Sequence, residues 1–170
     1  MARLRSLGPG EVAAAGDPLR TAFEQHSGTL LRLCALLLGR REGAEDLMQE
    51  SFVRLAPKVS RLEPEIVWPY LRRIAVNLAN DRFRRMALDF RARTQQVPGP
   101  SESPDAAVAQ EVWEAVRRLP ARQRACVVLR YYEDMTEKQI AEALGCSVGT
   151  VKSSASRALD HLRKELGDEA

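Results

Sequence analysis

The sequence has few of the residues that form metal sites, disulfide frameworks and β-sandwiches. It contains three cysteines and two histidines among 170 residues, and neither a CxxC pair nor a zinc-like His/Cys spacing is present. Cys34, Cys126 and Cys146 are therefore expected to be reduced thiols, and we expect neither a metal nor a cofactor. Aromatic residues make up only 5% of the sequence, which disfavours β-sandwich folds.

Long apolar runs are also missing. The longest, Leu33 to Leu38, has six residues, whereas a membrane-spanning helix needs about 20. The N-terminus contains no apolar signal-peptide core. We therefore expect a cytoplasmic protein with no membrane insertion.

The net charge of +3 is small but unevenly distributed. Residues 20–93 contain 14 basic and 9 acidic residues, and residues 94–111 contain three acidic residues and no basic one. Residues 112–170 are nearly balanced, with 10 basic and 9 acidic residues. A basic half and a balanced half on either side of a short acidic segment indicate two modules joined by a linker.

Apolar residues recur at helical spacing throughout the sequence, and no alternating strand pattern is present. We predict an all-α protein with two small helical domains joined by a flexible linker. The expected parts are a flexible N-terminal arm at 1–16, a first domain at 17–93, the linker at 94–107 and a second domain at 108–170. The linker assignment rests on the proline-rich stretch QQVPGPSESP, which cannot bury enough apolar surface to become ordered.

Caps and prolines indicate where the helices begin and end. The pair Asp17-Pro18 predicts the start of the first helix, and Gly39 predicts its end. Pro57 predicts the end of the second helix, and the third is expected to begin near Trp68-Pro69. A further helix is expected from about Ala121 to Tyr132.

The second domain carries the signature of a helix-turn-helix. Thr136 and Gln139 form a capping box, Gly145 supports a tight turn, and Ser147 can cap the helix that follows. That helix begins with small hydroxyl and cationic side chains, which suit base edges and phosphates in the major groove. The alternative is an ordinary αα-hairpin within a bundle, but capping, turn and polar face together favour DNA binding.

The third helix carries a line of cations and amides. Its members lie at i, i+4, i+7 and i+11, and further arginines flank them: Arg73, Asn77, Asn80 and Arg84 in the line, with Arg72, Arg82 and Arg85 beside it. Such a line can follow phosphates along a nucleic acid. The alternative is a solvated face with Arg–Asp pairs, but Asp81 can neutralise only part of this charge.

The second helix places several acidic and amide side chains opposite its apolar stripe: Glu45, Asp46, Gln49 and Glu50. No histidine or nucleophile accompanies the carboxylates, so the sequence disfavours a hydrolase, and we expect no enzyme and no catalytic residue. Taken alone, these residues indicate a solvated acidic face.

Segments in both halves resemble the sigma factors of bacterial RNA polymerase. In the second half these are residues 119–120, 123–124, 127–132, 136–144 and 148–153, which look like the domain that reads the −35 promoter element. In the first half, residues 44–52 resemble the segment that docks on the clamp coiled coil of core RNA polymerase. Residues 68–85 resemble the region that melts and reads the −10 element. With these two domains in this order, the chain is identified as a member of the extracytoplasmic-function (group four) sigma factors.

The resemblance implies a role for particular residues. Contacts with the −35 element would come from Ser147, Thr150, Lys152, Ser153 and Arg157. Contacts with the −10 element would come from Arg72, Arg73, Asn77, Asn80, Arg84 and Arg85. Docking on core RNA polymerase would use Asp46, Gln49 and Glu50. The implied partners are core RNA polymerase, promoter DNA and, as often in the family, an anti-sigma factor. The alternative is a stand-alone helix-turn-helix regulator that binds duplex DNA without polymerase.

Overall fold

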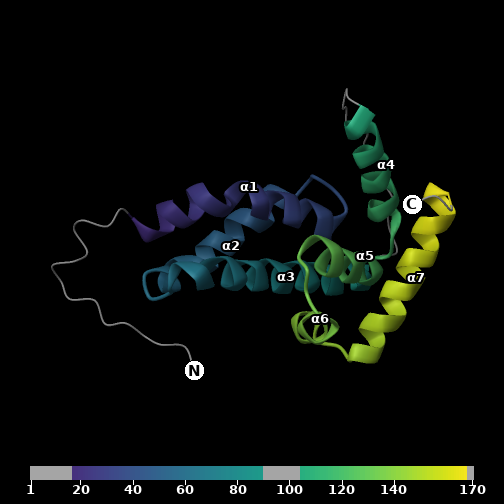
Figure 1. The fold of residues 1–170 in the computed structure, drawn as a ribbon. Helices are drawn as coiled ribbons and strands as arrows, with labels where there is room; N and C mark the ends of the chain where they lie inside the picture. Colours follow the sequence, from purple (N-terminus) through teal and green to yellow (C-terminus); the bar gives the residue numbers. More distant parts are fainter. Residues whose placement is uncertain (1–16, 90–103, 168–170) are drawn as a thin grey trace.

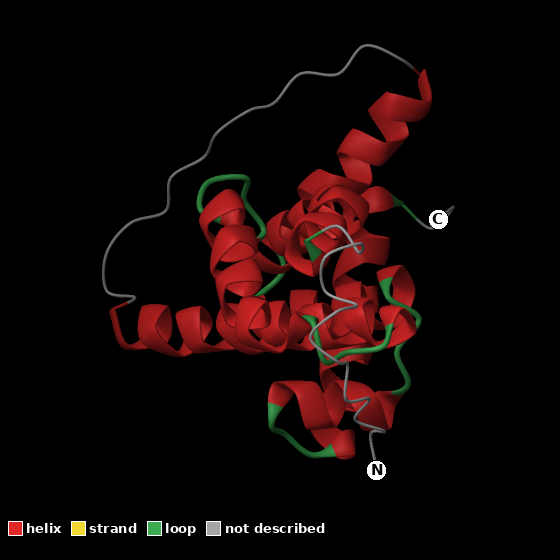
Figure 2. Cartoon of the chain, turned by 90° about the vertical axis from the view of Figure 1, so that its left-hand side faces the viewer, coloured by secondary structure: helices red, strands yellow, loops and turns green. Residues whose placement is uncertain are grey.

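The computed structural model describes residues 17–89 and 104–167, and every regular element within them is helical (Figure 2). In chain order these elements are α1 (Pro18–Leu38), α2 (Ala44–Val59), α3 (Pro64–Asp89), α4 (Pro104–Arg118), α5 (Ala121–Val127), the π-helical turn η1 (Val128–Tyr132), α6 (Glu137–Leu144) and α7 (Val148–Leu166). The predicted all-α fold is confirmed. The predicted arm at 1–16 and most of the predicted linker at 94–107 lie outside the described residues.

The ends of α1 follow its local sequence signals. The Asp17 carboxylate accepts a hydrogen bond from the backbone N–H of Leu19 at 3.1 Å, and Pro18 occupies the first helical position. At the other end Gly39 adopts a left-handed conformation with φ of 66°, and its N–H donates to the carbonyls of Ala35 and Leu36. Both predicted caps are therefore present.

The first half is a three-helix unit in which α1 packs against α2 and α3 and α2 packs against α3 (Figure 1). Apolar residues at helical spacing point from all three helices into one core. Its largest fully buried side chains are Leu30, Leu33, Leu37, Leu47, Leu55 and Leu71.

Two helices extend past the prolines that were expected to bound them. Helix α2 continues through Pro57 to Val59, and α3 already begins at Pro64, so that Pro69 lies inside it. The predicted start near Trp68-Pro69 was therefore wrong, whereas α2 ends close to Pro57, as expected. The extra turns bury Val59 and Val67, and this burial offsets the backbone hydrogen bonds that the prolines cannot donate. Pro64 loses nothing, because the first helical N–H has no intrahelical partner.

In the second half, α4, α5 and α6 each contact α7. The helix expected from Ala121 to Tyr132 does not remain α-helical, because its last five residues form the π-helical turn η1. The residues from 124 to 129 are all buried, with Leu129 fully inaccessible. The wider π-helical turn accompanies this unbroken run of buried positions, which one face of a regular α-helix does not provide.

The two halves share a core. A single cluster of buried apolar side chains includes Leu37 and Ala75 from the first half and Leu129, Ile140 and Leu144 from the second. Helix α1 contacts α4 and α5, and α3 contacts α6 (Figure 1). Among the described helices, none is both long and apolar enough to cross a membrane.

Candidate nucleic-acid interface

Helices α6 and α7 form the predicted helix-turn-helix. The Thr136 hydroxyl accepts from the Gln139 N–H at 3.3 Å, while the Gln139 side chain accepts from the Thr136 N–H at 2.9 Å. Gly145 closes α6 with φ of 62°, and its N–H donates to the carbonyls of Ala141 and Glu142. The capping box at the start of α6 and the glycine turn at its end are therefore confirmed.

The first turn of α7 places small hydroxyl groups and a cation at an accessible helix N-terminus. The Ser147 hydroxyl accepts from the Thr150 N–H at 3.1 Å and lies 2.9 Å from the Thr150 hydroxyl. The Ser153 hydroxyl donates to the Thr150 carbonyl at 3.1 Å. Lys152 and Arg157 are exposed. Ser147, Thr150, Lys152 and Ser153 thus lie at the N-terminal end of α7, where Ser147 is the N-cap, whereas Arg157 lies near the middle of the helix.

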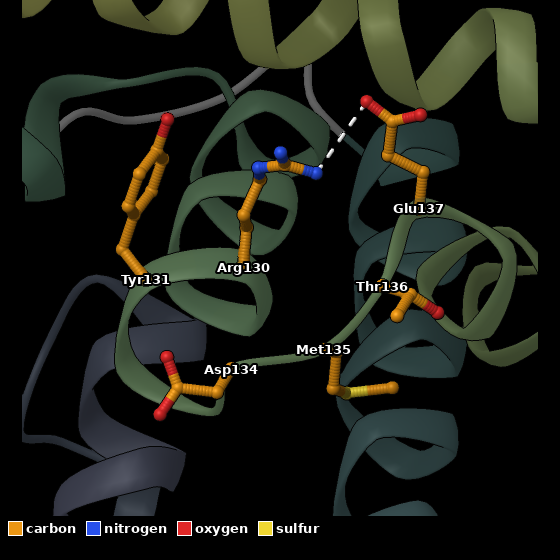
Figure 3. A pocket seen from close by; sticks show the side chains of 6 residues that line it. All are labelled: Arg130, Tyr131, Asp134, Met135, Thr136 and Glu137. Carbon is orange, nitrogen blue, oxygen red and sulfur yellow. Dashed lines mark ion pairs between the residues drawn. The ribbon is translucent and has the colours of Figure 1, made fainter.

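An open depression lies directly beside this helix-turn-helix (Figure 3). It is lined by Arg130, Tyr131, Asp134, Met135, Thr136 and Glu137. The Glu137 carboxylate lies 3.4 Å from the Arg130 guanidinium and 3.7 Å from the Lys152 ammonium. One acidic side chain therefore holds two cations near the start of α7, and all three groups are partly or fully exposed, so these pairs contribute little stability.

The predicted line of cations and amides on α3, the polar line, is exposed at several positions. Arg73 and Asn77 are exposed, and so are Arg84 and Arg85 further along the helix. The Arg73 guanidinium lies 5.1 Å from the centre of the Tyr70 ring. Exposed cations and amides along one helix face can contact successive phosphates.

Tyr70 and Lys58 extend this open surface toward α2. The Lys58 ammonium donates to the Tyr70 hydroxyl at 2.9 Å and lies 5.5 Å from the centre of its ring. This hydrogen bond, with the positive charges of Lys58 and Arg73, lowers the pKa of Tyr70. Both cations thus lie over the Tyr70 ring, where they make cation–π contacts.

Two of the predicted −10 residues instead contact the second half. The Arg72 guanidinium lies 3.0 Å from the Glu133 carboxylate and also donates to the Glu133 carbonyl at 3.3 Å. The Asn80 amide donates to the Leu144 carbonyl at the end of α6 at 3.3 Å. Burial raises the pKa of Glu133, although the Arg72 charge opposes this shift. Glu133 was not predicted as a functional residue, because no local pattern links positions 61 residues apart.

Arg124 is a second residue to which the sequence assigned no role. The residue is only 7% exposed, and its guanidinium donates to four backbone carbonyls. Two of these belong to Leu37 and Leu38 at the end of α1, and two to Arg117 and Leu119 at the end of α4. Burial lowers the pKa of Arg124 to about 10, because a charge is less favourable away from water.

The predicted polymerase-docking residues lie on the outer face of α2. Asp46 and Gln49 are exposed. Glu50 is half-buried and pairs with Arg54 at 2.9 Å and with Arg82 at 3.3 Å. The acidic face therefore presents two free polar positions and a third that already has cationic partners.

Two of the cysteines, Cys34 and Cys126, are buried free thiols. Burial raises the pKa of Cys34 to about 12 and that of Cys126 to about 11, so both thiols are protonated at neutral pH. No group of three or more His, Cys, Asp or Glu side chains able to hold a metal ion occurs within residues 17–89 and 104–167.

The second half contains a capped helix-turn-helix with exposed cations at the start of its second helix, and the first half presents a basic helix face. Together these features define a DNA-binding protein of the helix-turn-helix class. Comparison with known proteins narrows this class. Residues 22–87 match the Sigma-70 region 2 family, and residues 109–162 match the family described as Sigma-70, region 4.

Curated relatives and a solved structure agree with these matches. The chain is 36% identical over 155 residues to an RNA polymerase sigma-E factor of Streptomyces coelicolor, a match that covers 85% of each protein. It is 33% identical over 159 residues to the ECF RNA polymerase sigma factor SigM of Mycobacterium tuberculosis, covering 90% of this chain and 80% of SigM. The sigma factor RpoE, solved in complex with the anti-sigma factor NepR from Bartonella quintana, is 23% identical with a TM-score of 0.66. That match covers 89% of this chain and 98% of the RpoE chain, and it shows the same fold.

The chain therefore belongs to the extracytoplasmic-function sigma factors of bacterial RNA polymerase. Sigma factors are transcription initiation factors that bind core RNA polymerase and promoter DNA. The alternative of a stand-alone regulator is not favoured, because the family match extends over the first half as well as the helix-turn-helix.

Proposed function

We propose that this sigma factor reads the −35 element with the N-terminal part of α7 and the −10 element with the polar line of α3, while α2 docks on core RNA polymerase. The observation that carries the proposal is that each of these three helices presents an exposed polar face in the segment that resembles the family. The division into domains at 17–93 and 108–170, joined by a linker at 94–107, belongs to the same proposal.

For the −35 element, α7 enters the major groove with its N-terminus first. Lys152 and Arg157 are exposed and suit phosphates or guanine edges, and the Ser153 hydroxyl suits a base edge. Ser147 caps the helix and Thr150 lies in its first turn, so both hydroxyls lie at its positive end, where a phosphate is favoured.

For the −10 element, the exposed residues Arg73, Asn77, Arg84 and Arg85 contact phosphates. Arg72 and Asn80 join them once they are released from Glu133 and Leu144. Because each phosphate contact releases counterions, binding weakens steeply with salt.

For core RNA polymerase, Asp46 and Gln49 supply exposed polar contacts on α2, with Glu50 beside them. The chain acts by binding, in the cytoplasm, without a cofactor and without catalysing a reaction itself. An anti-sigma factor is a further proposed partner. A solved sigma factor of the same fold is bound to one, and we extend that kind of partner to this chain.

Run-off transcription tests this proposal. Purified chain and core RNA polymerase are incubated with promoter fragments from the source genome, and we expect transcripts that core polymerase alone does not make. If no fragment gives a transcript that depends on the chain, the proposal is wrong.

Substitutions separate the DNA and polymerase surfaces. Arg73→Ala and Arg84→Ala should reduce open-complex formation, measured by permanganate reactivity of the −10 region, while binding to core RNA polymerase is retained. Asp46→Ala should instead weaken core binding. Arg20→Ala, which removes an exposed cation from α1, is the matched control and should change neither property. An equal loss of core binding in Arg73→Ala would show that this face of α3 is structural.

A further inference from the structure

Arg82 lies on the side of α3 opposite the polar line. It follows Arg73 by nine residues, or about two and a half turns of an α-helix, so its side chain leaves α3 on the other face. There it meets α2, which packs against α3 (Figure 1). Its guanidinium donates to the Gly43 carbonyl at 3.0 Å and to the Glu50 carboxylate at 3.3 Å. Arg82 therefore connects the helix proposed to read the −10 element with the helix proposed to dock on polymerase.

The two contacts of Arg82 enclose the proposed docking residues. Nη1 donates to Gly43, directly before α2, and Nη2 donates to Glu50, about two turns further along. Asp46 and Gln49, the exposed polar residues of the proposed docking face, lie between these two points in the sequence. Because one planar guanidinium makes both contacts, it holds the two ends of this segment in a fixed relation to α3.

The first turn of α2 depends on this contact. Gly43 is the N-cap residue of α2 and provides no capping side chain. Its carbonyl accepts one hydrogen bond from the Leu47 N–H within the helix and a second from Arg82, both at 3.0 Å. The second bond has a charged donor, which makes it stronger than a neutral one. A side chain of α3 thus holds the first hydrogen-bonded turn of α2, and this turn contains Asp46.

The Glu50 carboxylate has a cationic partner at each oxygen. Oε1 lies 2.9 Å from Arg54, four residues further along α2, and Oε2 lies 3.3 Å from Arg82. The Arg54 side chain is 50% exposed and that of Arg82 is 27% exposed. An exposed pair within one helix contributes little, whereas the less accessible Arg82 pair joins two helices. Arg82 therefore determines where the Glu50 carboxylate lies relative to α3.

The charge of Arg82 also reaches α1. Burial raises the pKa of Cys34, a fully buried residue of α1, and the positive charge of Arg82 opposes this shift. The Arg82 side chain thus lies where all three helices of the first half meet. Its surroundings restrict its conformation, as a side chain that positions others requires.

We propose that Arg82 is a positioning residue for polymerase docking. It holds the start of α2 and the Glu50 carboxylate against α3, so that Asp46 and Gln49 are presented to core RNA polymerase in one orientation. A preorganised surface loses less conformational freedom on binding, so this positioning raises the affinity for core RNA polymerase. The proposal rests on the proposed function, because it takes α2 as the docking helix.

Substitutions of Arg82 by alanine and lysine test the proposal. Arg82→Ala removes both contacts, whereas Arg82→Lys keeps the charge but not the two-pronged geometry of a guanidinium. Arg32→Ala is the matched control, because it removes one positive charge whose hydrogen bond, to Thr29, stays within α1. Core RNA polymerase is titrated into chain labelled at its N-terminus, and anisotropy gives the dissociation constant. Circular dichroism and urea denaturation identify a temperature at which every variant is folded.

We expect Arg82→Ala to weaken core binding about tenfold and Arg82→Lys about threefold, the range expected for losing hydrogen bonds from a charged donor. Arg32→Ala should leave the affinity unchanged. If Arg82 is merely structural, Arg82→Ala lowers the urea midpoint but the folded chain binds with unchanged affinity, and this result would overturn the proposal. An affinity of Arg82→Lys equal to that of the unchanged chain would show that charge alone is sufficient, which also overturns it.

A double-mutant cycle tests whether Arg82 acts through Glu50. In a Glu50→Ala background, Arg82→Ala should weaken core binding only about threefold, because one of its two contacts is already absent. Effects that simply add would contradict the proposal.

Asp46→Ala distinguishes a failure of this proposal from a failure of the proposed function. If neither Asp46→Ala nor Arg82→Ala weakens core binding, α2 is not the docking helix and the proposed function fails. If Asp46→Ala weakens core binding and Arg82→Ala does not, only the role assigned to Arg82 is wrong.

Discussion

Gly39 permits both the end of α1 and the buried position of the Arg124 side chain. Its φ of 66° lies in the left-handed region, which a residue with a Cβ adopts only with strain. A Cβ at this position would lie 2.6 Å from the Arg124 Cζ and 2.7 Å from Nη1. The missing side chain therefore permits the turn and leaves room for the guanidinium.

We predict that Gly39→Ala lowers the free energy of unfolding by about 2 kcal/mol, from left-handed strain and displacement of Arg124. Urea denaturation measures the change. The matched control is Gly28→Ala inside α1, where a Cβ would meet nothing within 4 Å. It should raise stability by roughly 1 kcal/mol, because alanine has a higher helix propensity than glycine. Similar effects of both substitutions would contradict the role assigned to Gly39.

At the scale of elements, the capping box makes α6 a stable unit despite its length of eight residues. So short a helix is marginal in isolation and relies on its caps and its packing. Because the Gly145 turn joins α6 directly to the proposed reading helix, α7, the cap of one helix affects the placement of the other.

Thr136→Ala should therefore destabilise the chain by about 1 kcal/mol, since it leaves the Gln139 N–H without its side-chain acceptor. Hydrogen exchange at the backbone amides of α6 should increase more than exchange in α1. Thr21→Ala in the first turn of α1 is the control, because the Thr21 N–H is bonded to the Asp17 carbonyl whatever its side chain. We expect that variant to stay within about 0.5 kcal/mol of the unchanged chain. Unchanged exchange in α6 of Thr136→Ala would refute the prediction.

Elements that depend on local chemistry could be predicted from the sequence, and those that depend on distant packing could not. Thr136, Gly145 and the Asp17-Pro18 pair give local capping signals, and the structure has these caps. The start of α3 before Pro69 reflects burial of Val67, which no neighbouring residue reveals. The π-helical turn likewise accompanies a run of residues buried against several helices.

The same distinction applies to the candidate site. Helical spacing predicts that Arg73, Asn77 and Arg84 share one face of α3, and these three side chains are exposed. Spacing could not predict that Arg72 meets Glu133, because that contact joins two halves of the chain through the tertiary fold. A face can be predicted from the sequence, whereas the groups that cover it require the structure.

At the scale of the whole molecule, the shared core links the stabilities of the two halves. Each predicted domain has fewer than 80 residues, and a single domain of that size buries little apolar surface. Here Leu37 of α1 and Leu129 and Ile140 of the second half belong to one cluster. Each half therefore gains burial from the other, and we expect them to unfold together.

The two tryptophans of the chain allow this coupling to be measured, because Trp68 lies on α3 in the first half and Trp113 on α4 in the second. Trp113→Phe leaves a fluorescent reporter for the first half, and Trp68→Phe leaves one for the second. We predict coincident urea midpoints for these two variants, as a cooperative transition requires.

Adding Arg124→Ala to each variant should lower both midpoints and separate them. This substitution leaves the carbonyls of Leu37, Leu38 and Leu119 without their shared donor, at a cost of about 3 kcal/mol. It also removes a side chain that joins the ends of α1 and α4, so the Arg72–Glu133 pair, the Asn80–Leu144 hydrogen bond and the shared apolar cluster then couple the halves. Midpoints that already differ before Arg124 is changed would show that the halves unfold independently and that the contact between them contributes little to stability.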